Sequence, residues 1–166
     1  MKTKLLYFLV PALLIACSND DDGTKQVVEN TFTSSRNDQT WSGITEISLT
    51  PEDTLVFLGV GDGGTDNGAV VARVKFEGKG SYKLQGNRGI YYETVGGDAM
   101  ISQYSIEQGK TGSFDITFYD EESLYIEGDF ELLLKAERLN NANTTDSILT
   151  IVNGLFSGLI SESIID

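Results

Sequence analysis

Apolar and polar residues alternate along most of the chain from about residue 27 onward. In one such stretch Thr45, Ile47 and Leu49 alternate with Glu46 and Ser48. Side chains two positions apart on an extended strand share a face, so this period of two predicts a half-buried strand. The same order recurs over residues 70–76, 82–84, 90–95, 99–106 and 148–160. Residues 55–60 are apolar at successive positions, which favours a central strand.

The longest alternating stretch predicts a hairpin over residues 113–134. Phe114, Ile116 and Phe118 share one face of its first strand, and residues 120–123 form the connection. In the second strand the core face carries Leu124, Ile126, Phe130, Leu132 and Leu134, and the outer face carries Tyr125, Glu127, Asp129 and Glu131. A helix over residues 132–139 is the alternative. It ranks second because apolar and polar residues alternate without interruption from Leu124 onward.

Glycine precedes an aromatic residue by two positions at four places along the chain. The pairs are Gly80 and Tyr82, Gly112 and Phe114, Gly128 and Phe130, and Gly154 and Phe156. A glycine on a strand face leaves a gap that a neighbouring ring can cover, and it lets the sheet bend. Together with the turn residues between the strands, this pattern predicts an all-β domain over residues 27–166. The expected architecture is an antiparallel β-sandwich of roughly eight to ten strands.

Residues 59–64 match the G-x-G-x-x-G pattern of dinucleotide-binding proteins. That motif requires a helix to open at its third glycine, whereas alternation resumes here at Val70 and predicts a strand. Residues 59–68 are therefore expected to form a mobile hairpin loop. Asp62 and Asp66 are candidate Ca²⁺ ligands in this loop, although the spacing and closing Glu of an EF-hand are missing.

The N-terminal segment has the features of a secretory signal. Lys2 and Lys4 precede an apolar run over residues 5–14, which is too short to span a bilayer. Cys17 follows Leu14-Ile15-Ala16, a pattern that resembles the bacterial lipobox, in which the cysteine is acylated and becomes the mature N-terminus. A plain signal peptide with an incidental cysteine is the alternative. We expect a signal peptide over residues 1–16 and an acidic flexible tether over residues 17–26.

The acidic run after Cys17 indicates where the lipid-anchored protein is sorted. Residues 18–22, Ser-Asn-Asp-Asp-Asp, resemble the lipoprotein export signal of the Bacteroidetes. That resemblance implies an outer membrane location, with the lipid-anchored domain facing the cell exterior. Two or more acyl chains are needed for stable anchoring, because one chain alone binds a membrane marginally.

Composition excludes several classes of function. The whole chain has a net charge of −13, and without Lys2 and Lys4 there remain 10 basic and 25 acidic residues, a charge of −15. Such a protein is not expected to bind nucleic acid. The chain contains no histidine and a single cysteine. These counts exclude Ser-His-Asp and Cys-His catalysis and histidine-ligated metals, and no cofactor is expected.

Several segments of the domain resemble an uncharacterised family of small Bacteroidetes lipoproteins. The resemblance spans roughly residues 27–160 and lies in Phe32 with Trp41-Ser42-Gly43, in residues 80–82 (GSY), in residues 126–130 (IEGDF) and in residues 151–156 (IVNGLF). It implies an all-β domain at the cell surface and no known activity. Two further sites, Thr54 and Ser147, are similar to the O-glycosylation acceptors of the same bacteria, with a turn ending before a strand as the alternative explanation.

The sequence therefore favours a non-catalytic binding or accessory module that takes a glycan, a peptide or a protein partner. Aromatic side chains stack on sugar rings and anchor protein interfaces, so the candidate contact residues are Trp41, Tyr91, Tyr92, Tyr119 and Tyr125. The alternative is a carboxylate-based glycoside hydrolase. Its acids would come from the outer face of the predicted hairpin, at Asp115, Glu127, Asp129 and Glu131.

Overall fold

The structure, a computed structural model, describes residues 29–140 and 147–162. Its strands are β1 (Thr31–Arg36), β2 (Gln39–Leu49), β3 (Thr54–Gly61), β4 (Ala69–Lys75), β5 (Gly80–Leu84), β6 (Gly89–Val95), β7 (Ala99–Ile106), β8 (Gly112–Asp120), β9 (Tyr125–Leu139) and β10 (Ile148–Glu162). Two short 3₁₀ helices, η1 (Gly64–Asn67) and η2 (Gly86–Arg88), lie in the connections. The predicted all-β class and number of strands are confirmed.

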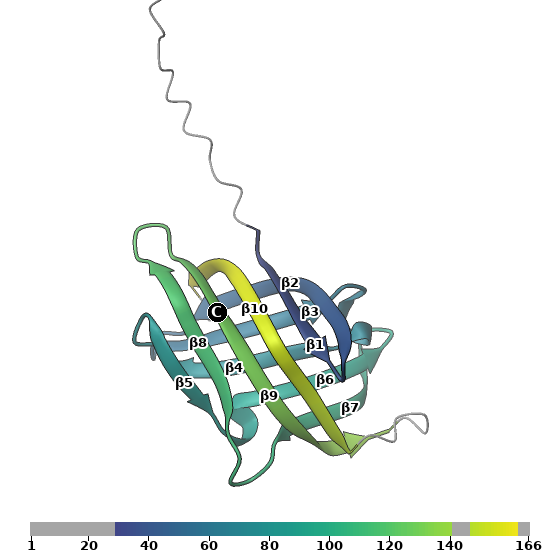
Figure 1. Cartoon of the computed structure of the whole chain (residues 1–166). Coiled ribbons are helices and arrows are strands. Elements are labelled where there is room, and N and C mark those ends of the chain that lie inside the picture. The colour runs from purple at the N-terminus through teal and green to yellow at the C-terminus, as the bar shows by residue number, and fades with distance from the viewer. Residues whose placement is uncertain (1–28, 141–146, 163–166) are drawn as a thin grey trace, which may run out of the picture.

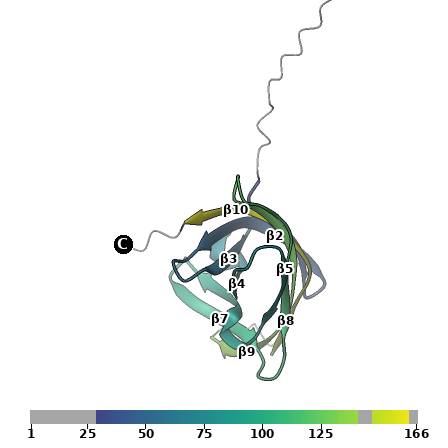
Figure 2. The same cartoon turned by 90° about the vertical axis from the view of Figure 1, so that its left-hand side faces the viewer.

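All ten strands belong to one sheet, so the predicted division into two separate sheets is not confirmed. The strand order is β1-β10-β2-β3-β4-β6-β7-β9-β8-β5, and β9 also pairs with β10. This extra pairing closes the sheet into a ring, which is visible in end view in Figure 2. In Figure 1, β1, β8, β9 and β10 form a front layer that runs diagonally across a back layer of β2, β3, β4, β6 and β7.

One strand pair is parallel, although the sequence predicts a wholly antiparallel sheet. β1 is antiparallel to β10 on one side and to β2 on the other. β10 and β2 must therefore run in the same direction. Where β1 begins at Thr31, β10 continues beyond it and pairs directly with β2, from Ile160 opposite Ile47 to Glu162 opposite Leu49.

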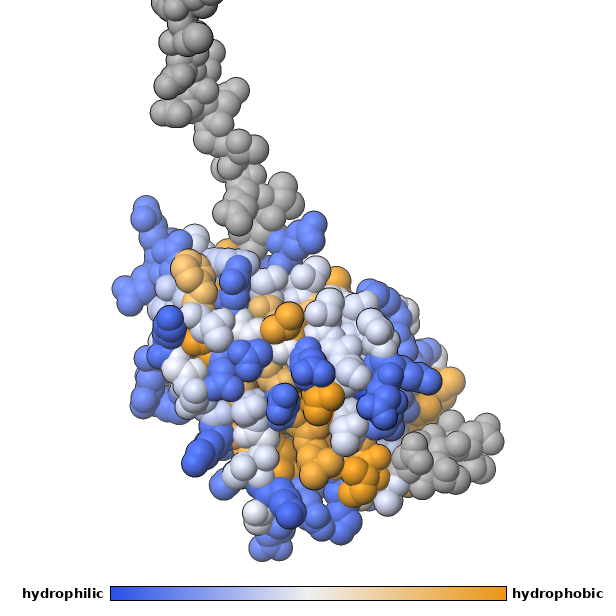
Figure 3. Space-filling view, viewed as in Figure 1, coloured by the Kyte–Doolittle hydropathy of each residue, from blue (hydrophilic) through white to orange (hydrophobic). Residues whose placement is uncertain are grey.

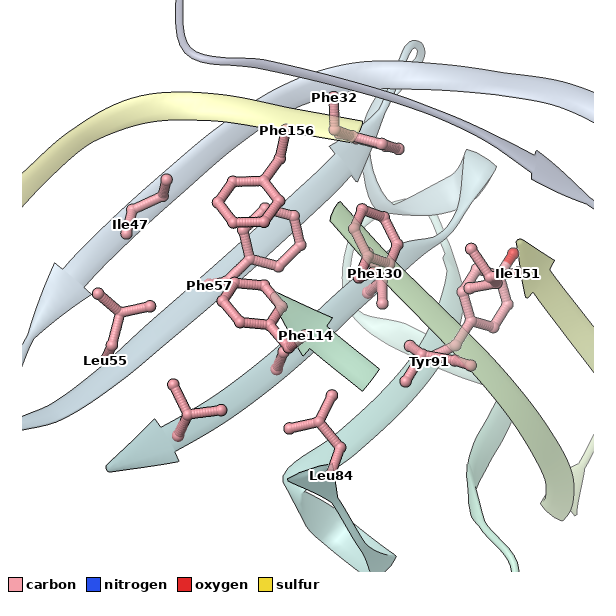
Figure 4. Packing of buried hydrophobic residues seen from close by; sticks show 14 of the residues in the cluster. Phe32, Ile47, Leu55, Phe57, Leu84, Tyr91, Phe114, Phe130, Ile151 and Phe156 are labelled. Carbon is pink, nitrogen blue, oxygen red and sulfur yellow. The ribbon is translucent and has the colours of Figure 1, made fainter. Parts of the chain in front are cut away.

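Aromatic rings from both layers fill the interior of the ring. The Phe57 ring from β3 lies 5.4 Å from Phe114 and Phe130 and 5.0 Å from Phe156, measured between ring centroids. Phe114 and Phe156 stack on each other at 4.7 Å. Figure 4 shows these rings meeting between strands of the two layers. The alternating apolar positions thus converge on a single core, because each strand turns the same face inward.

The predicted hairpin forms, with two corrections to the face on which side chains lie. The register of β8 and β9 shifts between Ile116 and Phe118, which turns Phe118 outward, so that it is 48% exposed. Leu124 was expected on the core face but lies in the turn before β9 at a φ of 57° and is 38% exposed. The strand continues to Leu139, so the helix considered for residues 132–139 is absent.

Two of the four glycine–aromatic pairs behave as predicted. A Cβ added at Gly128 would lie 2.6 Å from the Phe156 ring, and one at Gly154 would lie 2.7 Å from the Phe130 ring. Nothing lies within 4 Å of the corresponding position at Gly80. At Gly112 the nearest neighbour is the Leu132 side chain rather than a ring. Among these four pairs, a ring therefore covers the glycine only where β9 and β10 meet.

Several predicted features lie outside the described residues. They are the signal peptide over residues 1–16, Cys17 and the tether over residues 17–26.

A β-bulge interrupts β10 at Asn153-Gly154. Asn153 has a φ of 52°, and the register of β10 against β9 shifts between Ile151 and Gly154.

Candidate binding site

Two of the aromatic residues predicted to contact a ligand are buried instead. Trp41 is 3% exposed and Tyr91 is fully buried, so the prediction that they form an exposed surface is wrong. Tyr91 pairs with Val70 across β6 and β4, and both turn toward the core. Tyr92, the next residue, turns outward, and alternation alone does not say which of two adjacent tyrosines faces inward.

Trp41 and Tyr91 form a polar cluster around Arg36 at the end of β1. The guanidinium of Arg36 lies 5.1 Å from the Trp41 ring centroid and 5.6 Å from that of Tyr91. Its Nη1 donates to the Tyr91 hydroxyl and to the backbone oxygen of Asn67, each at 2.6 Å. The Tyr91 hydroxyl in turn donates to Glu93 at 2.5 Å.

Every member of the Arg36 cluster is engaged by another member. Ser102, which is fully buried, donates to the second oxygen of Glu93 at 2.9 Å, and the Trp41 indole donates to the Asn67 backbone at 3.1 Å. Burial, and then the hydrogen bond to Glu93, raise the pKa of the Tyr91 phenol well above its ordinary value of 10.0. Tyr91 therefore stays protonated, and the cluster joins β1, β2 and β6 without presenting a reactive group.

The other three predicted aromatics are half-buried, and each has different neighbours. Tyr119 packs edge-on against Phe76 with ring centroids 5.1 Å apart. Tyr125 lies 6.1 Å from the exposed Phe118 ring and donates to Glu127 at 2.7 Å. Tyr92 lies on the outer side of β6, opposite Gln103 of β7. The fold therefore does not assemble these tyrosines into one aromatic platform.

The glycine-rich connection between β3 and β4 holds η1, and its two candidate Ca²⁺ ligands have separate partners. Asp62 accepts a hydrogen bond from Ser42 at 2.8 Å. Asp66 accepts from Thr94 at 2.9 Å and from the backbone of Gly96 at 3.1 Å. Within residues 29–140 and 147–162 no group of three or more metal-ligating side chains is found. The loop predicted over residues 59–68 is shorter than expected, because residues 59–61 belong to β3, and the mobility expected of it stays a prediction.

The outer face of the front layer carries the acids considered for hydrolysis. Asp115 of β8 lies directly opposite Asp129 of β9, beside a shallow hollow of ≈320 Å³ that Asp129 and Glu131 line. Burial and the neighbouring carboxylates of Asp115 and Glu131 raise the pKa of Asp129. Figure 3 shows this side of the molecule, where hydrophilic residues surround apolar ones and no deep cleft is visible.

A larger, polar groove opens beside the end of β7. It has a volume of ≈930 Å³ and is lined by residues 85–87 before and within η2, by residues 105–110 at the end of β7 and in the turn after it, and by residues 135–137 of β9. The turn is held by the amide of Lys110, which donates to the backbone oxygen of Glu107 at 2.9 Å. Gly109 adopts a φ of 82°, which favours glycine at that position.

Charged side chains along one wall of the groove are held in fixed pairs. The Lys135 ammonium lies 2.9 Å from the Glu107 carboxylate, and this contact lowers the pKa of Glu107. Glu137 accepts hydrogen bonds from the Ser105 hydroxyl through one oxygen and from Gln103 through the other, the latter at 2.9 Å. Both walls come together because Ser105 of β7 lies opposite Lys135 of β9.

The lining of the groove is mostly polar, and its rim carries amides that have no side-chain partner in the described part of the chain. Ile106 also lines the groove, but it is 2% exposed and offers little apolar surface to a ligand. The side chains of Gln85, Asn87 and Gln108 make no hydrogen bond to another described residue, so their donors and acceptors face solvent. The sequence did not predict this site because its rim comes from two turns. The polar residues of these turns indicate a surface loop but not a binding groove.

The two candidate glycosylation sites differ in accessibility. Ser147 is exposed, just before β10, and its backbone oxygen accepts from the amide of Ala136 at 2.9 Å. Thr54 is half-buried at the first position of β3, where its amide donates to the Thr50 hydroxyl at 3.2 Å.

The described part of the chain contains no helix with the length and apolar character of a membrane span.

Comparison with known proteins does not identify a related protein or a related site. Neither protein-family models, nor curated proteins, nor solved structures give a match to this chain.

Proposed function

We propose that this protein is a non-catalytic binding module that takes a glycan in the polar groove between η2, β7 and β9. The observation that carries the proposal is the ≈930 Å³ groove, which amide, carboxylate and ammonium groups line. Ligand sites in proteins commonly measure about 300–1,000 Å³. The groove has that size, and its polar lining suits the many hydroxyl groups of a short oligosaccharide.

The chemistry of the rim suits a ligand that is rich in hydroxyl groups. The amides of Gln85, Asn87 and Gln108 each offer both donors and an acceptor, as a sugar hydroxyl does. Along the wall, Glu137 and the Lys135–Glu107 pair are already oriented by their neighbours. Such prior orientation reduces the entropy lost when a ligand binds. An uncharged glycan would also avoid repulsion by the net charge of −13.

The electrostatics support binding over hydrolysis. A glycoside hydrolase needs a carboxylic acid whose pKa is raised, so that it can protonate the leaving oxygen. Within the groove the pKa of Glu107 is lowered by Lys135, which favours the ionised form. The pKa of Asp129 is raised, but this residue lines the shallow ≈320 Å³ hollow elsewhere on the surface. The acid and the groove are thus on different parts of the molecule.

We also propose the location that the N-terminal sequence indicates. Cys17 follows Leu14-Ile15-Ala16, and acylation there would anchor the domain to the outer membrane, facing the cell exterior. Residues 17–28 precede the described domain, and twelve residues reach at most about 43 Å when fully extended. A glycan-binding module held in this way would collect its ligand at the cell surface, alone or as an accessory to a larger assembly.

A glycan array tests the proposal with lipid-free protein, residues 17–166 carrying Cys17→Ser. We expect one class of oligosaccharide to bind, and the double variant Asn87→Ala, Gln108→Ala to lose at least about tenfold in affinity, since each lost hydrogen bond is worth about 1 kcal/mol. These two side chains make no hydrogen bonds to other described residues, so their removal should leave stability unchanged.

The matched control is Glu121→Ala, Glu122→Ala, which removes exposed side chains from the β8–β9 turn. This variant should bind like the parent. Equal binding by the groove variant, or an array without any reproducible ligand, would contradict the groove as the site. Release of shortened sugars from a bound oligosaccharide would contradict the non-catalytic role.

A further inference from the structure

β3 is apolar on both faces, although only one of them points into the core. Leu55 and Phe57 are buried in the interior, at 0% and 1% exposure. Val56, Leu58 and Val60 alternate with them on the outer side and are half-buried. A strand with one face in water normally carries polar residues on that face. The outer side of β3 therefore resembles a surface that another element covers.

The apolar surface continues onto the strands beside β3. Directly paired residues on adjacent strands share a face, and the register places Leu58, Val71 and Ile90 in one row across β3, β4 and β6. A second row contains Ile44, Val60, Ala69 and Tyr92, in which Ile44 is 55% exposed and Ala69 is buried. We call this surface, made by Ile44, Val56, Leu58, Val60, Val71 and Ile90, the outer apolar face; Val71 at its centre is 6% exposed.

The front layer has a different outer surface. On β9 the outward positions carry Glu127, Asp129 and Glu131. The front layer thus mixes these carboxylates with exposed apolar residues such as Leu133 and Leu155, whereas the outer apolar face on the back layer is a continuous apolar surface. An exposed apolar area with this contrast to its surroundings marks an interaction surface.

Two opposite charges border the outer apolar face. Glu46 of β2 lies opposite Leu58, and Arg73 of β4 lies opposite Val56. Both side chains are exposed, and neither forms an ion pair with another described residue. They lie on opposite sides of β3 and are displaced along it by two residues. A two-fold axis in the plane of the face, crossing β3 between Val56 and Leu58, would bring each Glu46 onto the Arg73 of a second copy.

We propose that the outer apolar face is the contact surface of a symmetric dimer of this chain. Leu58 and Val56 of each copy would meet near the axis, as an isologous interface requires, and the Glu46–Arg73 pairs would lie at its edge. Four strands about 4.8 Å apart and about 20 Å of strand length give a flat area on the order of 400 Å². Stable interfaces bury about 800 Å² per partner, so the dimer is weak and depends on concentration.

Sedimentation velocity tests the dimer with residues 17–166 carrying Cys17→Ser. We expect a single monomer–dimer equilibrium between about 5 and about 500 μM, and a shift to monomer over this range for Leu58→Lys. Thr117→Lys on the outer face of the front layer is the matched control and should dimerise like the parent. Circular dichroism confirms that each variant is folded.

Charge exchange tests the two-fold geometry without altering the apolar residues. Glu46→Arg alone and Arg73→Glu alone each place like charges opposite one another, so each should raise the dissociation constant several-fold. The combination of both substitutions restores the opposite pairing and should return it to within about twofold of the parent value.

A parent protein that stays monomeric throughout the concentration range would overturn the proposal. Failure of the double exchange to recover dimerisation would do so as well, because it would show that Glu46 and Arg73 do not meet across the axis. Glycan binding in the groove is measured separately, so neither outcome bears on the proposed function.

Discussion

Gly128 on β9 and Gly154 on β10 each make room for a ring from the other strand. Gly128 is directly opposite Phe156, and Gly154 is directly opposite Phe130. Each ring lies over the glycine that it faces, so the two strands approach closely while the rings turn into the core. This mutual arrangement explains why two glycines are accommodated in the middle of long strands, where they would otherwise weaken the sheet.

Gly154→Ala should therefore destabilise the domain. The added Cβ would lie 2.7 Å from both the ring and the backbone oxygen of Phe130, and the backbone cannot move aside. Overpacking of this kind costs about 1–3 kcal/mol in the free energy of unfolding. Urea denaturation measures the change. Gly80→Ala, with no atom within 4 Å of the new Cβ, is the control and should be neutral or slightly stabilising.

The hydroxyl of Tyr91 links Arg36 to Glu93, and its removal should be costly. In Tyr91→Phe, Arg36 loses an acceptor at 2.6 Å and Glu93 loses a donor at 2.5 Å in a largely buried site. We expect a loss of about 1–3 kcal/mol in the free energy of unfolding. Tyr92→Phe is the matched control, since its hydroxyl makes no hydrogen bond to a described residue. Equal stability of the two variants would contradict the role of the Arg36 cluster.

At the scale of elements, η1 is tied to the end of β6 by one carboxylate. Asp66 accepts from the Thr94 hydroxyl and from the backbone amides of Gly96 and Gly97. The hydrogen bond from Thr94 makes the largest contribution to lowering the pKa of Asp66 below its ordinary value of 3.8. The sequence placed Asp66 in a flexible loop, because its partners lie some thirty residues further along the chain.

The stabilisation by Asp66 should depend on pH. Because the folded state lowers its pKa, folding favours the ionised carboxylate, and the stabilisation is present above pH 3.8 and lost as the pH falls through the folded pKa. Asp66→Ala should therefore lower the melting temperature at pH 5–8, and the difference from the parent should shrink below pH 3.8. Asp98→Ala, an exposed acid without a hydrogen-bond partner among the described residues, should show no such difference.

A further element, the β8–β9 hairpin, shows where sequence patterns stop being informative. Alternation correctly predicted both strands and the inward positions of Phe114 and Ile116. It could not predict the bulge after Ile116, which moves Phe118 outward and lets Tyr119 pack on Phe76. A bulge changes the face of every residue that follows it, and its position depends on the partner strand.

For the molecule as a whole, the sequence predicted the class and the approximate number of strands but not how they close. Alternation is a local signal, whereas the pairing of Thr31 with Ser157 joins residues at opposite ends of the domain. The groove was missed for the same reason, since Asn87, Glu107 and Glu137 are brought together only by the register of β7 and β9. The burial of Trp41 and Tyr91 follows from that closure as well.

The proposed anchoring of the whole molecule rests on Cys17, which lies outside the described residues. Cys17→Ala in the full chain should move the protein from the membrane fraction to the soluble fraction, because no acyl chain would then be attached. Mass spectrometry of the parent should find acyl chains on a mature N-terminus at this residue. Ser18→Ala keeps the cysteine and should remain membrane-bound. Membrane retention of the Cys17→Ala protein would contradict lipid anchoring.

The position of β10 has a consequence for when the domain can fold. This strand pairs with β1, β2 and β9, so it completes the ring, and among the described strands it is the last to be synthesised. Contacts between residues so far apart in the sequence form slowly, because a long loop must close before they are made. A nascent chain that lacks residues 148–162 cannot close the sheet. The growing polypeptide should thus stay unfolded until β10 has been synthesised, and this extended state is the one that the proposed export to the cell surface requires.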